Sequence, residues 1–132
     1  MEKILLKKSF QINNFKEINY NSLWGCKGIF TTIRLSGKTP KLILIENHIK
    51  KLNQDLKYFD INFTLTKNFL NVFLNKYSLI KNYNHLLRIA INKKIISLSL
   101  RKRISPEKIF TAKMINYQRA LPEYKNLQYK KI

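Results

Sequence analysis

The sequence predicts an α+β fold in which an antiparallel sheet carries two helices on one face. Segments rich in β-branched and aromatic residues occur near both ends of the chain, and two segments with apolar residues at helical spacing lie between them. The resulting order is three strands, two helices and three strands, which is typical of a layered α+β domain. The chain of 132 residues contains no repeat and no Gly- or Ser-rich linker, so we expect one main folded domain.

Three strands are predicted before the helices. Residues 4–12 form the first, with mixed alternation of apolar and polar side chains. Residues 29–35 form the second, which is rich in β-branched residues and ends at the turn residues Ser36 and Gly37. Residues 42–45 are a short apolar run, and we expect them to pair with the second strand as a hairpin.

Two helices follow. Asn47 is the expected N-cap of the first helix, and Thr64 or Thr66 that of the second. The apolar residues of the first helix recur at helical spacing: Ile49, Leu52, Leu56 and Phe59. The second helix is expected to present one apolar face: Leu65, Phe69, Val72, Phe73 and Leu74. Three more strands are then predicted at residues 86–91, 95–100 and 110–117, with residues 92–94 joining the first two.

The chain is strongly basic, with 26 Lys plus Arg against 7 Asp plus Glu and a formal net charge of +19. Lys outnumbers Arg by 21 to 5, a preference that an AT-rich coding sequence would produce, but such a bias does not explain the shortage of acids. A basic surface attracts polyanions through counterion release. A small protein that binds RNA or ribosomal surfaces is therefore the alternative interpretation of this sequence.

Several other classes are excluded or disfavoured. The lone Cys26 excludes an internal disulfide framework and a Cys-rich zinc site, and neither His48 nor His85 has a ligand partner at metal-binding spacing. We therefore expect no metal. No apolar run approaches the ~20 residues of a membrane-spanning helix, and the N-terminus does not have the pattern of a secretory signal. The prediction is a cytoplasmic protein without membrane contact.

One stretch of the sequence resembles a known family. It comprises Trp24-Gly25-Cys26-Lys27-Gly28-Ile29-Phe30-Thr31-Thr32-Ile33-Arg34, then Gly37-Lys38, then His48-Ile49-Lys50-Lys51-Leu52. This stretch resembles the N-terminal region of the fold-type IV pyridoxal-phosphate enzymes, the class IV aminotransferases and aminodeoxychorismate lyases. The segment Leu87-Arg88-Ile89-Ala90-Ile91 suits the central strand of the family's small domain. The Phe-Thr-Thr sequence looks closest to aminodeoxychorismate lyases.

A second segment, Lys125-Asn126-Leu127-Gln128-Tyr129, is similar to the family's segment whose lysine binds the cofactor covalently. The resemblance implies pyridoxal 5'-phosphate as cofactor, Lys125 as the catalytic and cofactor-binding lysine, and Lys51 at the position of the family's phosphate-binding arginine. A lysine supplies charge to a phosphate without the bidentate fork of an arginine. The competing interpretation of Lys125 is one surface lysine among many, and that of Lys51 is a solvated helix residue.

The resemblance also implies a function. It would be the conversion of aminodeoxychorismate to p-aminobenzoate and pyruvate in folate biosynthesis or, in the aminotransferase branch, transfer of an amino group to a keto acid. The substrate would be a small amino-acid-like molecule. We expect residues 1–118 to form the family's small domain, and residues 119–132 to be the linker and cofactor-lysine segment of a truncated C-terminal domain. Such a truncated chain would be inactive alone, and its expected partners are a homodimer mate or a separate C-terminal half.

Other residues receive weaker assignments. In the family, the strand with Thr32 and Arg34 faces the substrate, so these two side chains are candidate ligand contacts. The basic cluster at residues 101–103 is either a phosphate-binding stripe or solvated surface, and aromatic residues do not interleave it. His48 and His85 are expected to have structural roles, and Cys26 to be a buried or half-buried thiol.

Overall fold

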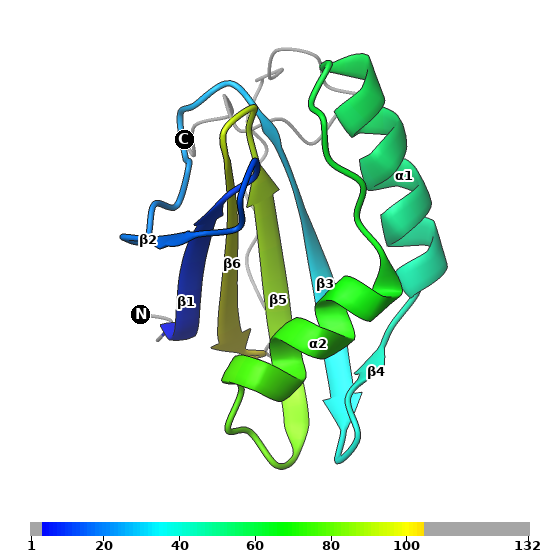
Figure 1. The fold of residues 1–132 in the computed structure, drawn as a ribbon. Helices are drawn as coiled ribbons and strands as arrows, with labels where there is room; N and C mark the ends of the chain where they lie inside the picture. Colours follow the sequence, from blue (N-terminus) through cyan, green and yellow to red (C-terminus); the bar gives the residue numbers. More distant parts are fainter. Residues whose placement is uncertain (1–3, 105–132) are drawn as a thin grey trace, which may run out of the picture.

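The computed structural model describes residues 4–104, which form six strands and two helices (Figure 1). In chain order the elements are β1 (Ile4–Gln11), β2 (Glu17–Ile18), β3 (Ile29–Gly37), β4 (Lys41–Leu42), α1 (Ile45–Tyr58), α2 (Lys67–Tyr77), β5 (Tyr83–Ile91) and β6 (Ile95–Lys102). All neighbouring strands are antiparallel, in the order β2-β1-β6-β5-β3-β4. The predicted strand at residues 110–117 and the segment with Lys125 lie outside the described residues.

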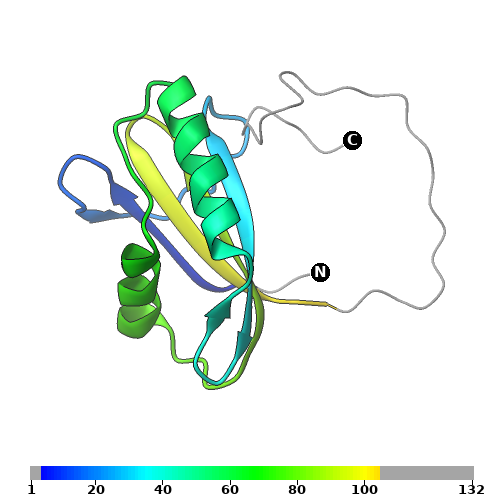
Figure 2. The ribbon, with the colours of Figure 1, turned by 90° about the vertical axis from the view of Figure 1, so that its right-hand side faces the viewer.

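Both helices lie on one face of the sheet, as the α+β prediction requires (Figures 1 and 2). Side chains of a strand alternate between faces, so every second residue of each long strand points toward the helices. On β5 and β6 these residues are almost entirely apolar and fully buried: Leu87, Ile89, Ile91, Ile96, Leu98 and Leu100. With residues of β3, α1 and α2 they form one hydrophobic core, which holds the two helices against the sheet.

The other face of the sheet is polar at its centre. The strand register places Arg88 between Thr32 on β3 and Ser99 on β6, and Ser97 opposite Ser9 of β1. The loop before β3 covers part of this face. Its Asn21 carbonyl accepts a hydrogen bond from the Ser97 hydroxyl at 2.6 Å.

The predicted strand at residues 42–45 is wrong in extent. β4 contains only Lys41 and Leu42, and α1 begins at Ile45, with Leu44 rather than Asn47 at its N-cap. Leu44 adopts a left-handed backbone conformation, with φ at 54°, which turns the chain from strand into helix. A run of four apolar residues does not distinguish a buried strand from the buried start of a helix. Here Leu42 is buried before the turn, at the end of β4, and Ile45 is buried after it, at the start of α1.

The second helix begins as one of the two alternatives predicts. The Thr66 hydroxyl accepts a hydrogen bond from the backbone N–H of Phe69 at 3.1 Å, so Thr66 is the N-cap. The expected place of Val72 on the apolar face is wrong, because its side chain is 54% exposed. Val72 lies about 200° around the helix axis from the fully buried Leu70, at 100° per residue, and therefore points toward solvent.

Within the described residues, no helix is long and apolar enough to cross a membrane. The longest, α1, has 14 residues and a polar face.

Leu70→Ala tests the core packing of α2. Removing a fully buried leucine should lower the free energy of unfolding by about 2–5 kcal/mol. Val72→Ala on the same helix should change it by less than about 0.5 kcal/mol, because the side chain is already half exposed. Urea denaturation followed by circular dichroism measures both. Equal losses for the two variants would contradict this placement of α2.

Candidate anion-binding site

A hollow of about 210 Å³ lies between the first turns of α1 and the outer strand β3, and we call it the α1 hollow. Strand β4 pairs only with Leu35 and Ser36, so the first half of β3 is an open edge among the described strands. The hollow forms beside this edge. Its lining combines residues of β3 and of α1: Phe30, Thr31, Leu44, Asn47, His48, Lys51, Leu52 and Asp55.

A hydrogen bond between Thr31 and His48 joins the strand to the helix. The Thr31 hydroxyl and His48 Nδ1 lie 2.9 Å apart. Thr31 is buried because it points toward the helices, whereas Thr32, the next residue of the strand, points to the polar face. The structural role expected for His48 is therefore confirmed for this contact, which fixes the first turn of α1 against β3.

Lys51 lies one turn further along α1. Its ammonium contacts the Asp55 carboxylate at 3.1 Å, a pair four residues apart on the same helix. The Lys51 side chain is 52% exposed, whereas that of Asp55 is 4% exposed. Lys51 thus provides a charge partner for a buried carboxylate and still presents its amine to the hollow.

These groups fit a phosphate better than they fit a metal or a cation. The Thr31 hydroxyl, the Lys51 ammonium and the positive N-terminal end of α1 all favour an anion. Asp55 is the one acidic residue of the lining, and it shares the ammonium that a phosphate would use. A phosphate group placed in the α1 hollow would therefore compete with Asp55 for Lys51.

Arg88 occupies the middle of the polar face and is only 6% exposed. Its guanidinium carbon lies 4.2 Å from the centre of the Trp24 ring and 5.6 Å from that of Phe30. Its Nη1 donates a hydrogen bond of 2.9 Å to the Ser22 carbonyl. Loop residues 22–24 thus hold one side of the guanidinium.

On the opposite edge of this guanidinium, the only side-chain hydrogen-bond partner indicated within residues 4–104 is the Tyr20 hydroxyl, and it is not well aligned with either nitrogen. Nε and Nη2 of Arg88 are buried and make no well-aligned hydrogen bond among the described residues, nor does Arg88 form an ion pair with any described carboxylate. These two nitrogens carry the parallel N–H bonds that bind a carboxylate in bidentate fashion. Burial lowers the pKa of Arg88; the Tyr20 side chain opposes this shift through its charge and a hydrogen bond, and Arg101 adds to the lowering. A second cation nearby makes this region still more attractive to an anion.

The sequence interpretation placed residues 87–91 in a strand but assigned Arg88 no role. The only signal was a charged residue in the middle of the apolar segment Leu-Leu-Arg-Ile-Ala-Ile. Such a residue is either at an exposed strand edge or buried with a function. Which of these two applies to Arg88 depends on the loop at residues 22–24, which contacts its side chain and lies more than 60 positions away in the chain.

The other candidates are distributed over the fold. Thr32 is half-buried beside Arg88, and Arg34 is exposed on the same face. Arg101 and Lys102 are neighbours in β6 and point to opposite faces, so they do not form one stripe. His85 is buried, with Nδ1 accepting from the Asn84 backbone N–H at 2.8 Å, and burial, followed by Lys102, lowers its pKa. Cys26 is half-buried, as expected.

No group of three His, Cys, Asp or Glu side chains within residues 4–104 is arranged to hold a metal ion. Comparison of the chain with protein-family models, with curated proteins and with solved structures finds no match. The assignment of function therefore rests on the residues described above.

Arg88→Met tests whether Arg88 serves the fold or a ligand. A buried charge that is only partly satisfied within residues 4–104 contributes little net stability, so replacing it with an apolar side chain of similar length should change the free energy of unfolding by less than about 1 kcal/mol. Arg34→Met on the exposed part of the same face is the control, with an expected change within about 0.5 kcal/mol. A loss of about 3 kcal/mol or more for Arg88→Met would show that Arg88 holds the fold together.

Proposed function

We propose that this chain contains the small domain of a fold-type IV pyridoxal-phosphate enzyme similar to aminodeoxychorismate lyase, and that Arg88 binds the carboxylate of its amino-acid-like substrate. The observation that carries the proposal is the edge of a buried guanidinium whose Nε and Nη2 make no well-aligned hydrogen bond within residues 4–104, with only the Tyr20 hydroxyl nearby. Folding alone gives no reason to keep such an edge inside the protein, because two buried donors without well-aligned acceptors cost free energy. A carboxylate ligand would satisfy both.

The position of Arg88 supports the same interpretation. It lies next to Thr32 on the sheet face that the family resemblance assigns to the substrate. The α1 hollow lies on the other side of the same strand, since Phe30 and Thr31 line the hollow and Phe30 also contacts the guanidinium. A phosphate-binding position and a carboxylate-binding position are thus separated by one strand, β3, at its open edge.

In this proposal Lys51 and the first turn of α1 hold the phosphate of pyridoxal 5'-phosphate, and Lys125 binds its aldehyde. When bound, the cofactor supplies a ring that withdraws electrons from the reacting carbon. Arg88 fixes the orientation of the substrate through two parallel hydrogen bonds. Trp24 and Phe30 flank the guanidinium and exclude water from it, which strengthens its attraction for the carboxylate.

The cofactor assignment predicts one preferred lysine. After incubation of the full chain with pyridoxal phosphate and reduction with borohydride, peptide mapping by mass spectrometry should place the dominant adduct on Lys125. Lys125→Arg should remove this adduct, and Lys130→Arg, a nearby lysine, should leave it. Lys51→Met should raise the cofactor concentration for half-labelling about tenfold, and Lys50→Met should not, because one phosphate contact is worth about 1.5 kcal/mol.

An adduct spread over many lysines, and unchanged by Lys125→Arg, would contradict the assignment. Asp55→Asn provides a further check of the α1 hollow. This variant frees the Lys51 ammonium from its carboxylate partner and should therefore lower the cofactor concentration needed.

The carboxylate assignment can be read from the protein's single tryptophan, because Trp24 contacts the Arg88 guanidinium. Titration with pyruvate should change Trp24 fluorescence in a saturable way. Arg88→Gln should weaken the apparent affinity by about 10–100-fold, the worth of a charge-assisted bidentate pair, and Arg34→Gln should weaken it less than threefold. Methyl pyruvate, which lacks the carboxylate, serves as the neutral ligand. Equal responses to pyruvate and methyl pyruvate would refute a carboxylate site at Arg88.

A further inference from the structure

We propose that the end of the sheet at the β5–β6 hairpin binds single-stranded nucleic acid through Lys27, Lys93 and Lys94. We call this region the hairpin-end surface; it comprises two adjoining hollows that share Lys93 and Lys94. It does not include Arg88 or Lys51, and so the inference is independent of the proposed enzymatic function.

A tight turn fixes two of these lysines. The Asn92 side-chain oxygen accepts hydrogen bonds from the backbone N–H groups of Lys94, at 2.8 Å, and Ile95, at 2.7 Å. The Asn92 N–H donates to the Ile95 carbonyl at 3.0 Å. Because the backbone of the turn is held in this way, Lys93 and Lys94 project from the tip of the hairpin in a defined arrangement, and both are exposed.

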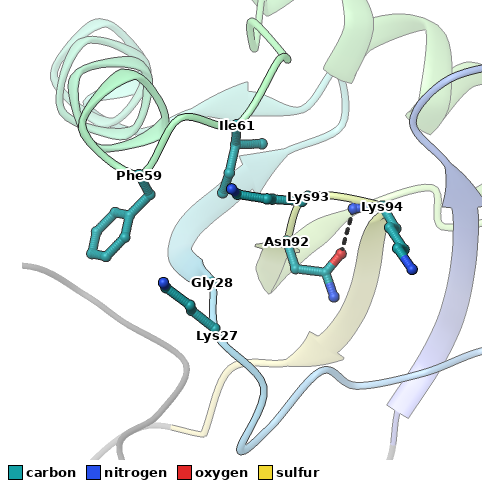
Figure 3. Close-up of a pocket in the computed structure, with 7 residues that line it drawn as sticks. All are labelled: Lys27, Gly28, Phe59, Ile61, Asn92, Lys93 and Lys94. Atoms are coloured by element: carbon teal, nitrogen blue, oxygen red, sulfur yellow. Dashed lines mark hydrogen bonds between the residues drawn. The ribbon is translucent and has the colours of Figure 1, made fainter.

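The first hollow, of about 210 Å³, lies on one side of the hairpin. Lys27 and Lys93 extend toward the same space from two different segments, beside the ring of Phe59 (Figure 3). Lys94 extends to the other side of the hairpin (Figure 3). Amines that converge beside an aromatic ring suit a ligand with both a negative charge and a flat apolar part.

The second hollow, of about 590 Å³, lies between the hairpin and the end of β1. Its lining adds the amide side chains of Gln11, Asn13 and Asn62 to Lys93 and Lys94. Amides carry both donors and acceptors, so they can pair with the edges of bases, whereas lysines contact phosphates as point charges. The backbone N–H of Ile12 donates to the Lys94 carbonyl at 2.9 Å, which holds the two sides of this hollow together.

No acidic residue lines either hollow among the residues described. Two exposed carboxylates adjoin lining residues in sequence: Asp60 lies between Phe59 and Ile61, and Glu17, which precedes Ile18, pairs with Lys8 at 2.9 Å. The surface thus has an excess of positive charge, which favours a polyanion. The concave shape favours single-stranded nucleic acid over a duplex. The bases of a flexible single strand can enter the two hollows, whereas a rigid duplex would bridge over them without entering.

Fluorescence anisotropy with a labelled single-stranded RNA of about 12 nucleotides tests the inference. The folded chain should bind it, and the logarithm of the affinity should fall with the logarithm of salt concentration with a slope of about −2, as expected for three phosphate contacts. The triple variant Lys27→Gln, Lys93→Gln, Lys94→Gln should lose at least tenfold in affinity and most of this slope.

The control variant has the same loss of charge at the opposite end of the sheet, where Gly37 pairs with Tyr83: Lys38→Gln, Lys41→Gln, Lys81→Gln. It should keep affinity within about threefold of the unmodified chain, and Asp60→Asn should bind more tightly. Equal losses for the two triple variants would mean attraction by net charge alone and would overturn the site. Absence of binding at low salt, or equal binding of a duplex of the same length, would also overturn it.

Discussion

The guanidinium of Arg88 is buried on the central strand β5, and its Nε and Nη2 make no well-aligned hydrogen bond within residues 4–104. This buried charge is the constraint that shapes the polar side of this protein. Taking such an ion out of water costs several kcal/mol, and the loop before β3 compensates only in part, through the Ser22 carbonyl and the Trp24 ring. The hydroxyl groups of Ser9 and Ser97 anchor the same loop through Asn21. Loop, sheet and guanidinium therefore form one polar layer, and a carboxylate is the ligand that would complete it.

The apolar side of the sheet supplies stabilisation that offsets the free-energy cost of this polar layer. Strand β5 lies between β3 and β6, and its side chains alternate between the buried core residues Leu87 and Ile89 and the charged Arg88. The helices α1 and α2 pack on the buried core residues, and this packing supplies the hydrophobic stabilisation of the domain. The same alternation on β3 places Thr31 in the α1 hollow and Thr32 beside Arg88. One strand at an open sheet edge thus separates the α1 hollow from Arg88, the two positions at which we propose that phosphate and carboxylate bind.

The sequence was informative where local patterns determine structure and less so where distant segments meet. Runs of apolar and β-branched residues bounded by turn residues predicted β3, β5 and β6, and Thr66 was one of the two caps predicted for α2, because both signals lie within a few residues. The start of α1 was misplaced because it depends on the left-handed conformation of Leu44. Arg88 was missed because its burial comes from a loop far away in the chain. The hollows at the β5–β6 hairpin were missed for the same reason, since they join five segments of the chain.

The most direct test of the carboxylate site is NMR of the full chain with labelled arginine, in which the Arg88 Nε–H signal is followed during titration with pyruvate. We expect this signal to move downfield and saturate as the carboxylate accepts from Nε, while the Arg34 signal stays in place. The titration should extend to the pyruvate concentration that saturates the Trp24 fluorescence change. A carboxylate site at Arg88 would be contradicted if the Arg88 signal does not respond over this range, or if it moves no more than the Arg34 signal.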